Sequence, residues 1–258
     1  MLAHVPIPSI YKQWIMKRIL VLLMAVATLS CMAQKKPVNP DVYYARRATL
    51  FDLLPVYSSD IIMLGNSLTS AQDMPDILAE LTGAEVVCHT LTDGAEWNEL
   101  FDNCHVKNRG IVGDIIPGFF ERLEPILKGQ PRKIFIMGGV NDISHGVSAD
   151  SIVSAMTQVV TTIQARCPKT EIYVQSMLPF NNDVRLWKLL KGREQVVVDG
   201  NKGLESMCQR LGVTFINLYP LFVGENGKMK PEYTNDGLHL MGGAYLIWRD
   251  ALLPYIRK

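Results

Sequence analysis

The sequence predicts an α/β protein, a three-layer α/β/α sandwich whose parallel sheet is covered by helices on both faces. Short apolar runs typical of buried strands alternate with segments whose apolar residues recur every three or four positions, as in amphipathic helices. This alternation favours a parallel sheet with right-handed crossovers and short connections. With 258 residues, 48% hydrophobic and 20% charged, the chain has the composition of one globular domain with a sizeable core. We find neither an internal repeat nor a second domain.

The N-terminal residues have the pattern of an export signal. Residues 16–18 read Met-Lys-Arg, residues 19–29 form an apolar run of signal length, and Ala33 ends a small-residue cleavage site. We therefore expect residues 1–33 to be a signal peptide, with Met16 as an alternative start, and the mature protein to be secreted or periplasmic. Cys31 allows a rival interpretation as a lipid-anchor site, which we weigh below cleavage after Ala33.

Charge, apolar runs and cysteine spacing argue against three other kinds of protein: nucleic-acid-binding, membrane-spanning, and metal- or disulfide-containing. A net charge of +1, with no basic run interleaved with aromatic residues, argues against a nucleic-acid partner. No run beyond the signal approaches the roughly 20 apolar residues of a membrane span. No pair of cysteines has the CxxC spacing of a zinc or redox motif, so we favour small buried side chains over disulfides. The cysteines beyond the signal are Cys88, Cys104, Cys167 and Cys208.

Residues 34–54 are expected to be a linker and lead-in, and residues 55–258 the folded domain. Residues 35–40 are polar and contain proline, whereas residues 42–54 predict a short helix. The first strand is the apolar run at 60–64, which ends on Gly65, Asn66 and Ser67.

The remaining elements follow in alternation. Apolar runs predict strands at 84–88, 133–137, 171–175 and 213–218, and a further strand is expected at 105–107. Helical spacing predicts helices at 74–81, 115–127, 152–163, 204–211 and 241–256. Pro168 and Gly212 supply stop signals after the third and fourth of these helices.

Ser67 is the candidate nucleophile because it directly follows the carboxyl end of a buried strand. Open α/β sheets bind their ligands at this edge. A serine hydroxyl is a weak nucleophile by itself, so the hypothesis requires a base, a group that orients the base, and oxyanion donors.

His239 is the candidate base, since imidazole is suited to accept a hydroxyl proton near neutral pH. Asp236, three positions earlier, can reach the other ring nitrogen and fix the tautomer. Alternatively, Asp236 starts a turn or caps the last helix, and His239 packs beneath it.

Three groups are candidate oxyanion donors: the N–H of Ser67, the N–H of Gly110 and the side-chain amide of Asn141. Gly110 follows Asn108-Arg109 at the end of a predicted strand, and Asn141 follows the strand at 133–137. Each also has a structural interpretation, as a turn glycine for Gly110 and as a helix cap for Asn141 or Ser67.

Together these segments resemble the four blocks of the SGNH, or GDSL-type, hydrolases, in the same order and over residues 60–255. The blocks are Gly65-Asn66-Ser67-Leu68, Asn108-Arg109-Gly110, Gly139-Val140-Asn141-Asp142 and Asp236-Gly237-Leu238-His239. Residues 106–114 and 173–179 resemble the platelet-activating-factor-acetylhydrolase-like branch. The resemblance implies a flavodoxin-like sheet, ester hydrolysis through an acyl-serine, and no metal or cofactor. It also implies Ser67 as nucleophile, His239 as base, Asp236 as orienting acid, and Gly110 and Asn141 as oxyanion donors.

The chain departs from the family pattern in two places. Asn66 replaces the usual aspartate before the serine, which we expect to tune activity rather than abolish it. Residues 70–93 intervene before a segment that usually follows the serine block closely. They leave two candidates for the second strand, at 84–88 leading to Gly94 or at 105–107 leading to Gly110, and we choose the latter.

The sequence therefore predicts a secreted serine esterase that acts on a small-molecule or glycan ester. We favour short acyl groups, in particular acetyl esters on carbohydrates. A lysophospholipase or thioesterase would use the same residues, and a carbohydrate-binding relative that has lost catalysis is the alternative from another class. The sequence does not decide whether four aromatic residues belong to the core or line a substrate site: Trp97, Phe180, Trp187 and Tyr233. His145, in a loop, either touches a substrate or is simply exposed.

Overall fold

Five parallel strands form one sheet in the part of the chain that the structure, a computed structural model, describes: residues 40–70, 96–185 and 187–257. The strand order is β2-β1-β3-β4-β5, which is the flavodoxin-like order. The strands are β1 (Ile61–Gly65), β2 (Val106–Gly110), β3 (Lys133–Met137), β4 (Glu171–Gln175) and β5 (Thr214–Ile216). The predicted fold class is confirmed.

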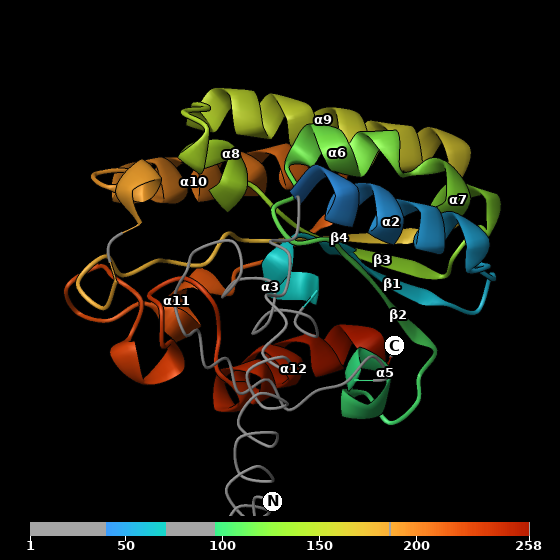
Figure 1. The fold of residues 1–258 in the computed structure, drawn as a ribbon. Helices are drawn as coiled ribbons and strands as arrows, with labels where there is room; N and C mark the ends of the chain where they lie inside the picture. The colour runs from blue at the N-terminus through green and yellow to red at the C-terminus, as the bar shows by residue number, and fades with distance from the viewer. Residues whose placement is uncertain (1–39, 71–95, 186, 258) are drawn as a thin grey trace, which may run out of the picture. The chain divides into compact units, whose positions relative to one another are not determined.

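Helices cover both faces of this sheet (Figure 1). One layer contains α2 (Pro40–Leu53), α6 (Ile116–Glu121), α7 (Glu124–Lys128), α8 (Val140–Ser144), α9 (Ala149–Arg166) and α10 (Glu194–Leu211). The other contains α5 (Glu96–Leu100), α11 (Tyr219–Phe222) and α12 (Gly242–Ile256). The short helix α3 (Ser67–Ser70) follows β1, and two 3₁₀ turns, η1 (Lys188–Leu190) and η2 (Pro231–Tyr233), lie in connections.

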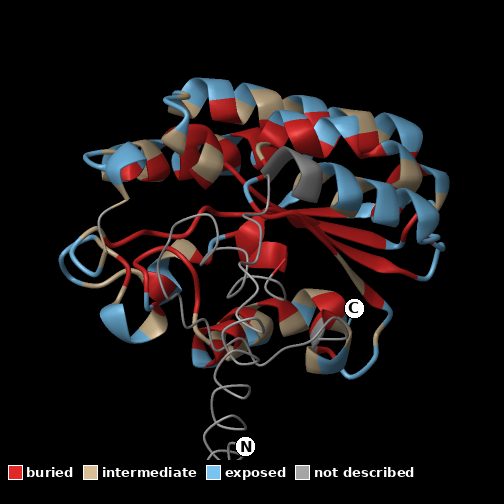
Figure 2. Cartoon of the chain, in the orientation of Figure 1, coloured by how far each residue is buried: buried red, intermediate tan, exposed pale blue. Residues whose placement is uncertain are grey.

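The central strands β1, β3 and β4 are largely apolar, since both faces of the sheet are buried there (Figure 2). The edge strand β2 is instead mostly polar and only partly buried. Along β1, Ile62 and Leu64 pack into the core beneath α6, α7, α9 and α10, whereas Ile61 and Met63 pack into the core beneath α5 and α12. Successive side chains of a strand point to opposite faces, so one apolar run supplies both cores.

The register brings the strand ends level with one another at the edge where the candidate residues lie. Gly65, the last residue of β1, is paired with Gly110 on β2 and with Met137 on β3. The chain continues from these positions into α3, the loop before α6, and α8. Segments far apart in sequence therefore meet at one edge of the sheet.

The helix predicted at 115–127 is two helices, α6 and α7, and this part of the prediction is wrong. Pro125 has no N–H to donate to the carbonyl of Glu121, and its ring clashes there, so one continuous helix cannot pass through it. Arg122 leaves the helical conformation with φ −108° and ψ 19°. Phe120, which the pattern assigned to the buried face, is 48% exposed.

The second strand in the described residues is β2, which overlaps the segment that we chose at 105–107 and ends at Gly110. The helix predicted at 74–81 and the strand at 84–88 lie outside the described residues, as does the signal at 1–33. Helix α2 falls within the expected lead-in and begins before residue 42. Residues 38–258 form one compact unit by their own contacts.

Two general features of the described residues bear on earlier expectations. None of their helices combines the length and the apolar character needed to cross a membrane. Cys104, Cys167 and Cys208 are free thiols, and the last two are buried. Cys31 and Cys88 lie outside the described residues.

Candidate active site

The turn between β1 and α3 presents Ser67 at the carboxyl edge of the sheet. Asn66 caps this turn, because its Oδ1 accepts a hydrogen bond from the N–H of Leu68 at 3.1 Å. Gly65 is required by space, since a Cβ there would lie 2.0 Å from Oγ1 of Thr69. The glycine and the asparagine cap together fix where the serine hydroxyl lies.

Ser67, His239 and Asp236 form a hydrogen-bonded chain. The Oγ of Ser67 lies 3.0 Å from Nε2 of His239, and Nδ1 of the same ring lies 2.6 Å from Oδ2 of Asp236. Each of the three residues is at most 4% exposed. The structure thus brings together the residues that the sequence pattern selected, in the geometry of a nucleophile, a base and an orienting acid.

The two carboxylate oxygens of Asp236 have different partners. Its Oδ1 accepts the N–H groups of Leu238 at 2.9 Å and His239 at 2.8 Å, together with the hydroxyl of Thr234 at 3.3 Å. Burial by itself would raise the pKa of Asp236, but the hydrogen bond and charge of His239 and these N–H groups outweigh burial and lower the pKa to about 2. The acid is therefore ionised at neutral pH, with Oδ2 directed at the imidazole.

Trp187 is the aromatic residue that packs against this chain of three. Its ring centroid is 5.8 Å from that of His239, edge to face, and its Nε1 donates to the main-chain oxygen of Asp236 at 2.7 Å. Trp187 remains half-buried, whereas Trp97 and Phe180 are each 2% exposed and belong to the core. The structure therefore separates these three aromatic candidates, and of the three it is Trp187 that lies against His239.

Gly110 lies at the end of β2, but its N–H already has a partner. It donates to Oδ1 of Asn108 at 2.8 Å. A Cβ at Gly110 would lie 2.2 Å from the main-chain nitrogen of Ser70, so the glycine allows α3 to approach β2 closely. The structure thus gives Gly110 a packing role and occupies the N–H that was expected to face an oxyanion.

Gly113, three residues further on, has the free N–H that Gly110 lacks. It has a φ of +79°, and a Cβ there would have nothing within 4 Å. Among the described residues, neither the N–H of Gly113 nor that of Ser67 donates a hydrogen bond. Sequence reasoning missed Gly113, although a glycine in the loop after a strand was the signal that could have found it.

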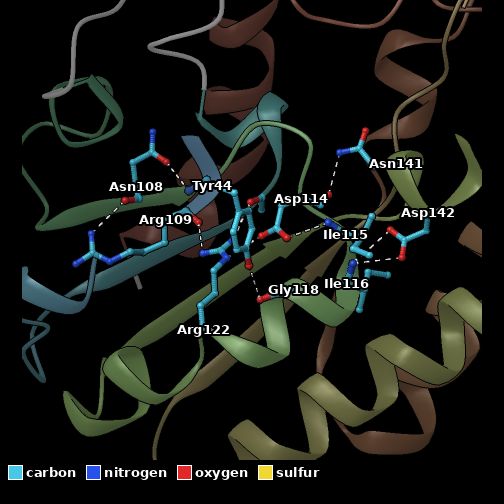
Figure 3. Close-up of polar contacts among 12 residues, drawn as sticks. Tyr44, Asn108, Arg109, Asp114, Ile115, Ile116, Gly118, Arg122, Asn141 and Asp142 are labelled. Atoms are coloured by element: carbon cyan, nitrogen blue, oxygen red, sulfur yellow. Dashed lines mark hydrogen bonds and ion pairs between the residues drawn. The ribbon is translucent and has the colours of Figure 1, made fainter. Parts of the chain in front are cut away.

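Asn141 lies on α8, directly after β3, and its side chain faces the Gly113 loop. Its Nδ2 donates to the main-chain oxygen of Asp114 at 2.8 Å (Figure 3). One of the two amide hydrogens is thereby used, and the other remains for a ligand. His145, at the end of α8, is exposed, with Nδ1 2.7 Å from the main-chain oxygen of Asn141.

A buried ion pair lies behind this loop. Nε of Arg122 is 2.7 Å from Oδ2 of Asp114, and both side chains are at most 5% exposed (Figure 3). Burial raises the pKa of Asp114 to about 6 against the lowering effect of Arg122 and of the Ile115 N–H. Asp142 accepts the N–H of Ile116 through both carboxylate oxygens, at 3.2 and 3.3 Å, which ties the loop to α8.

The arrangement can perform acyl transfer. It combines a hydroxyl with an adjacent imidazole, a carboxylate that sets the imidazole tautomer, and N–H donors at the same edge of the sheet.

Comparisons with known proteins identify the family of the chain. The model of the GDSL-like Lipase/Acylhydrolase family matches residues 63–245. Platelet-activating factor acetylhydrolase IB subunit alpha2 from Rattus norvegicus is 28% identical over 154 residues, 58% of this chain and 63% of that protein. The human subunit alpha2 aligns with the same identity and coverage. The aligned region therefore spans less than two thirds of these relatives.

Solved structures share the fold. A GDSL-like lipase from Bacteroides thetaiotaomicron superposes with a TM-score of 0.66 at 21% identity, over 83% of this chain and 97% of the other. An acetyl xylan esterase superposes with a TM-score of 0.56 at 17% identity, over 76% of this chain and 98% of the other.

Proposed function

The chain belongs to the GDSL-like Lipase/Acylhydrolase family, and from this membership we propose that it is a serine ester hydrolase with Ser67 as its nucleophile. The observation that carries the proposal is the hydrogen-bonded chain from Ser67 through His239 to Asp236, at 3.0 and 2.6 Å. Its members come from segments 172 residues apart, and both ring nitrogens of the histidine have the partners that acyl transfer requires.

In the proposed reaction, Nε2 of His239 takes the proton of Ser67 while Oγ attacks the ester carbonyl carbon. The carbonyl carbon becomes tetrahedral and its oxygen takes the negative charge. This intermediate collapses to the acyl-serine as the histidine donates the proton to the leaving alcohol. Water, deprotonated by the same histidine, then attacks the acyl carbon. The bond from that carbon to Oγ breaks, the histidine returns the proton to Ser67, and the acid is released. Asp236 contributes by holding the imidazole in the required tautomer and stabilising its charged form.

The oxyanion would be held by the N–H of Ser67, the second amide hydrogen of Asn141 and a glycine N–H after β2. We assign this last donor to Gly113, because its N–H is free and its loop contacts Asn141 through Asp114. Gly110 can replace it only if the side chain of Asn108 turns away from the Gly110 N–H. Replacing Gly113 by glycolate in a semisynthetic protein, so that a backbone ester removes the N–H and the φ of +79° stays accessible, tests the assignment: kcat falls about 100-fold if Gly113 is a donor.

For the substrate we propose short acyl esters, in particular acetyl groups on carbohydrates. Two comparisons support an acetyl preference: the sequence relatives are platelet-activating factor acetylhydrolase subunits, and one structural neighbour is an acetyl xylan esterase. Trp187, half-buried beside His239, offers an aromatic surface for a sugar ring or for an acyl chain. A lysophospholipase or thioesterase activity remains the alternative within the same mechanism.

The deciding experiment is hydrolysis of p-nitrophenyl esters from acetate to octanoate, with Ser67→Ala as the matched control. Acetate cleaved best by the wild type, with a silent Ser67→Ala, supports the acetylesterase. A preference for octanoate keeps the mechanism and moves the substrate toward lipids. A folded wild type that turns over no ester but binds an acetylated glycan would refute the enzyme and support the binding relative.

We also propose that the mature enzyme begins after Ala33 and works outside the cytoplasm. The support is the basic, apolar and small-residue pattern of residues 16–33. N-terminal sequencing of the protein from a secreting host tests it: Gln34 as first residue supports cleavage, and a lipid-modified Cys31 refutes it.

A further inference from the structure

Arg122 holds together three segments at the carboxyl edge of the sheet. Its guanidinium donates to the main-chain oxygen of Gly65 at 2.9 Å, to that of Arg109 at 2.6 Å, and to Oδ2 of Asp114 at 2.7 Å. The residue is 7% exposed and lies in the junction between α6 and α7. One planar group thus bonds the end of β1, the end of β2 and the loop that follows β2.

Two of these three contacts, those to Gly65 and Asp114, lead directly to segments that carry proposed oxyanion donors. Gly65 lies two residues before Ser67 in the capped turn. Asp114 follows Gly113, and its main-chain oxygen accepts the amide of Asn141. The donors come from separate strands, and the guanidinium of Arg122 connects the segments that carry them.

We propose, on the basis of the esterase function above, that Arg122 paired with Asp114 is a positioning residue that sets the oxyanion donors at their working distances. Oxyanion stabilisation depends on donors held in place before the reaction, so a small displacement of one segment weakens it. The residue touches no substrate and acts through the backbone that it binds.

The geometry requires an arginine rather than any cation. A guanidinium offers five donors in a fixed planar fork, so it can satisfy two carbonyls and a carboxylate at once, whereas a lysine ammonium is a point charge on a flexible stem. The carboxylate is also confined, because a Cβ at Gly118 would lie 2.0 Å from Oδ1 of Asp114. The hydroxyl of Tyr44 donates to the Gly118 main-chain oxygen at 3.3 Å and adds α2 to this packing (Figure 3).

The test compares Arg122→Ala and Arg122→Lys with a control that removes another buried cation, Lys133→Ala. Lys133 is fully buried at the opposite end of the sheet, where its Nζ donates to the main-chain oxygen of Tyr255. Steady-state kinetics on p-nitrophenyl acetate give kcat and KM. The rate at which a p-nitrophenyl phosphonate labels Ser67 gives a second readout, because the phosphoryl oxygen of the adduct uses the same donors.

We expect Arg122→Ala to lower kcat and the labelling rate about 100-fold while KM changes less than about threefold, since the lost stabilisation acts only in the transition state. Arg122→Lys should lose about tenfold. Added guanidinium ion at non-denaturing concentration should restore kcat of Arg122→Ala about tenfold and leave Lys133→Ala unchanged. Lys133→Ala should lose stability and keep kcat.

Several outcomes would overturn the inference. The first is a kcat of Arg122→Ala equal to that of Lys133→Ala. The second is a raised KM of Arg122→Ala with its kcat retained, and the third is a kcat of Arg122→Ala that added guanidinium ion does not restore. If Arg122→Ala does not fold, Arg122→Lys decides, and a wild-type kcat for it refutes the positioning role. If the wild type labels at Ser67 but cleaves no ester, the proposed substrate fails while the labelling rates still test Arg122. If the wild type is not labelled at all, function and inference both fall.

Discussion

Replacing Asp236 with asparagine should strongly reduce activity while leaving the fold of its loop intact. The two side chains have the same shape, so the asparagine oxygen can keep the N–H groups of Leu238 and His239 that Oδ1 accepts now. The amide nitrogen then takes the place of Oδ2, 2.6 Å from Nδ1 of His239. An amide N–H cannot accept from an imidazole N–H, so the ring proton moves to Nε2 and the ring can no longer accept from Ser67.

The expected magnitude has two parts. Asparagine does not supply the charge with which the Asp236 carboxylate stabilises the protonated imidazole; a hydrogen bond to a charged group contributes about 1.5–3 kcal/mol, so its loss costs about 10- to 100-fold in rate. The wrong tautomer adds to this, so kcat should fall by about 10³ to 10⁴. His239→Ala removes the base altogether and should cost about 10⁶.

The assay is kcat on p-nitrophenyl acetate for wild type, Asp236→Asn and His239→Ala, with circular dichroism to show that each variant is folded. The reasoning predicts that Asp236→Asn retains about 100 times the activity of His239→Ala. An Asp236→Asn variant within tenfold of wild type would show that the carboxylate does not set the tautomer. One as inactive as His239→Ala would show that orientation and proton transfer are not separable here.

Three further predictions concern stability and the first block. Gly65→Ala should cost about 1–3 kcal/mol of unfolding free energy in urea, because its Cβ would meet Thr69, whereas Gly243→Ala, with open space in α12, should gain about 0.5–1 kcal/mol. Asn66→Asp should keep the cap and change kcat/KM by less than about tenfold, and a loss above 100-fold would contradict this. Because the folded pKa of Asp236 is lowered, its stabilisation is full above pH 4 and is lost as the pH falls toward 2. Wild type should therefore lose about 2 kcal/mol more than Asp236→Asn over that window in guanidinium unfolding, and equal losses would contradict it.

The parts of the fold that sequence predicted well have local causes. The strand at 133–137 agrees with β3 residue for residue, because a short apolar run bounded by turn residues has few other ways to be buried. The helix that ends before Gly212 does so because that glycine adopts φ +68°. The same reasoning failed at 115–127. The helical spacing of apolar residues continues across Pro125 there, and the prediction followed that spacing rather than the helix-breaking effect of the proline.

The nucleophile and its base were predictable for a similar reason. Asp236 and His239 are three residues apart, and Ser67 follows a strand directly, so each feature lies within one short segment. Gly110 illustrates the limit. Whether an N–H is free depends on the side chain of Asn108 and on the approach of Ser70, and neither contact has a signature in the spacing of the motif.

Asn66 bears on whether the site is built for catalysis or for binding alone. Its Oδ1 performs the capping that fixes the serine turn, and that function needs an acceptor oxygen rather than a charge. Its Nδ2 is buried and has no hydrogen-bond partner among the described residues, which costs free energy. An aspartate at this position would avoid that cost but would bury a charge. The substitution therefore changes the electrostatics beside Ser67 without disturbing its position, which favours an altered rate over a lost activity.

The triad and the oxyanion donors differ in how the chain holds them. Asp236 and His239 fix each other within one loop, through hydrogen bonds that the loop itself completes. The oxyanion donors follow the ends of three strands. Arg122 bonds the ends of β1 and β2 and the side chain of Asp114, whose main-chain oxygen accepts the amide of Asn141 after β3. Mutations that loosen the packing of α6 and α7 should therefore reduce transition-state stabilisation before they disturb the proton transfer between Ser67 and His239. The distinction is measurable, since such variants would lose kcat while their pH dependence stayed that of the wild type.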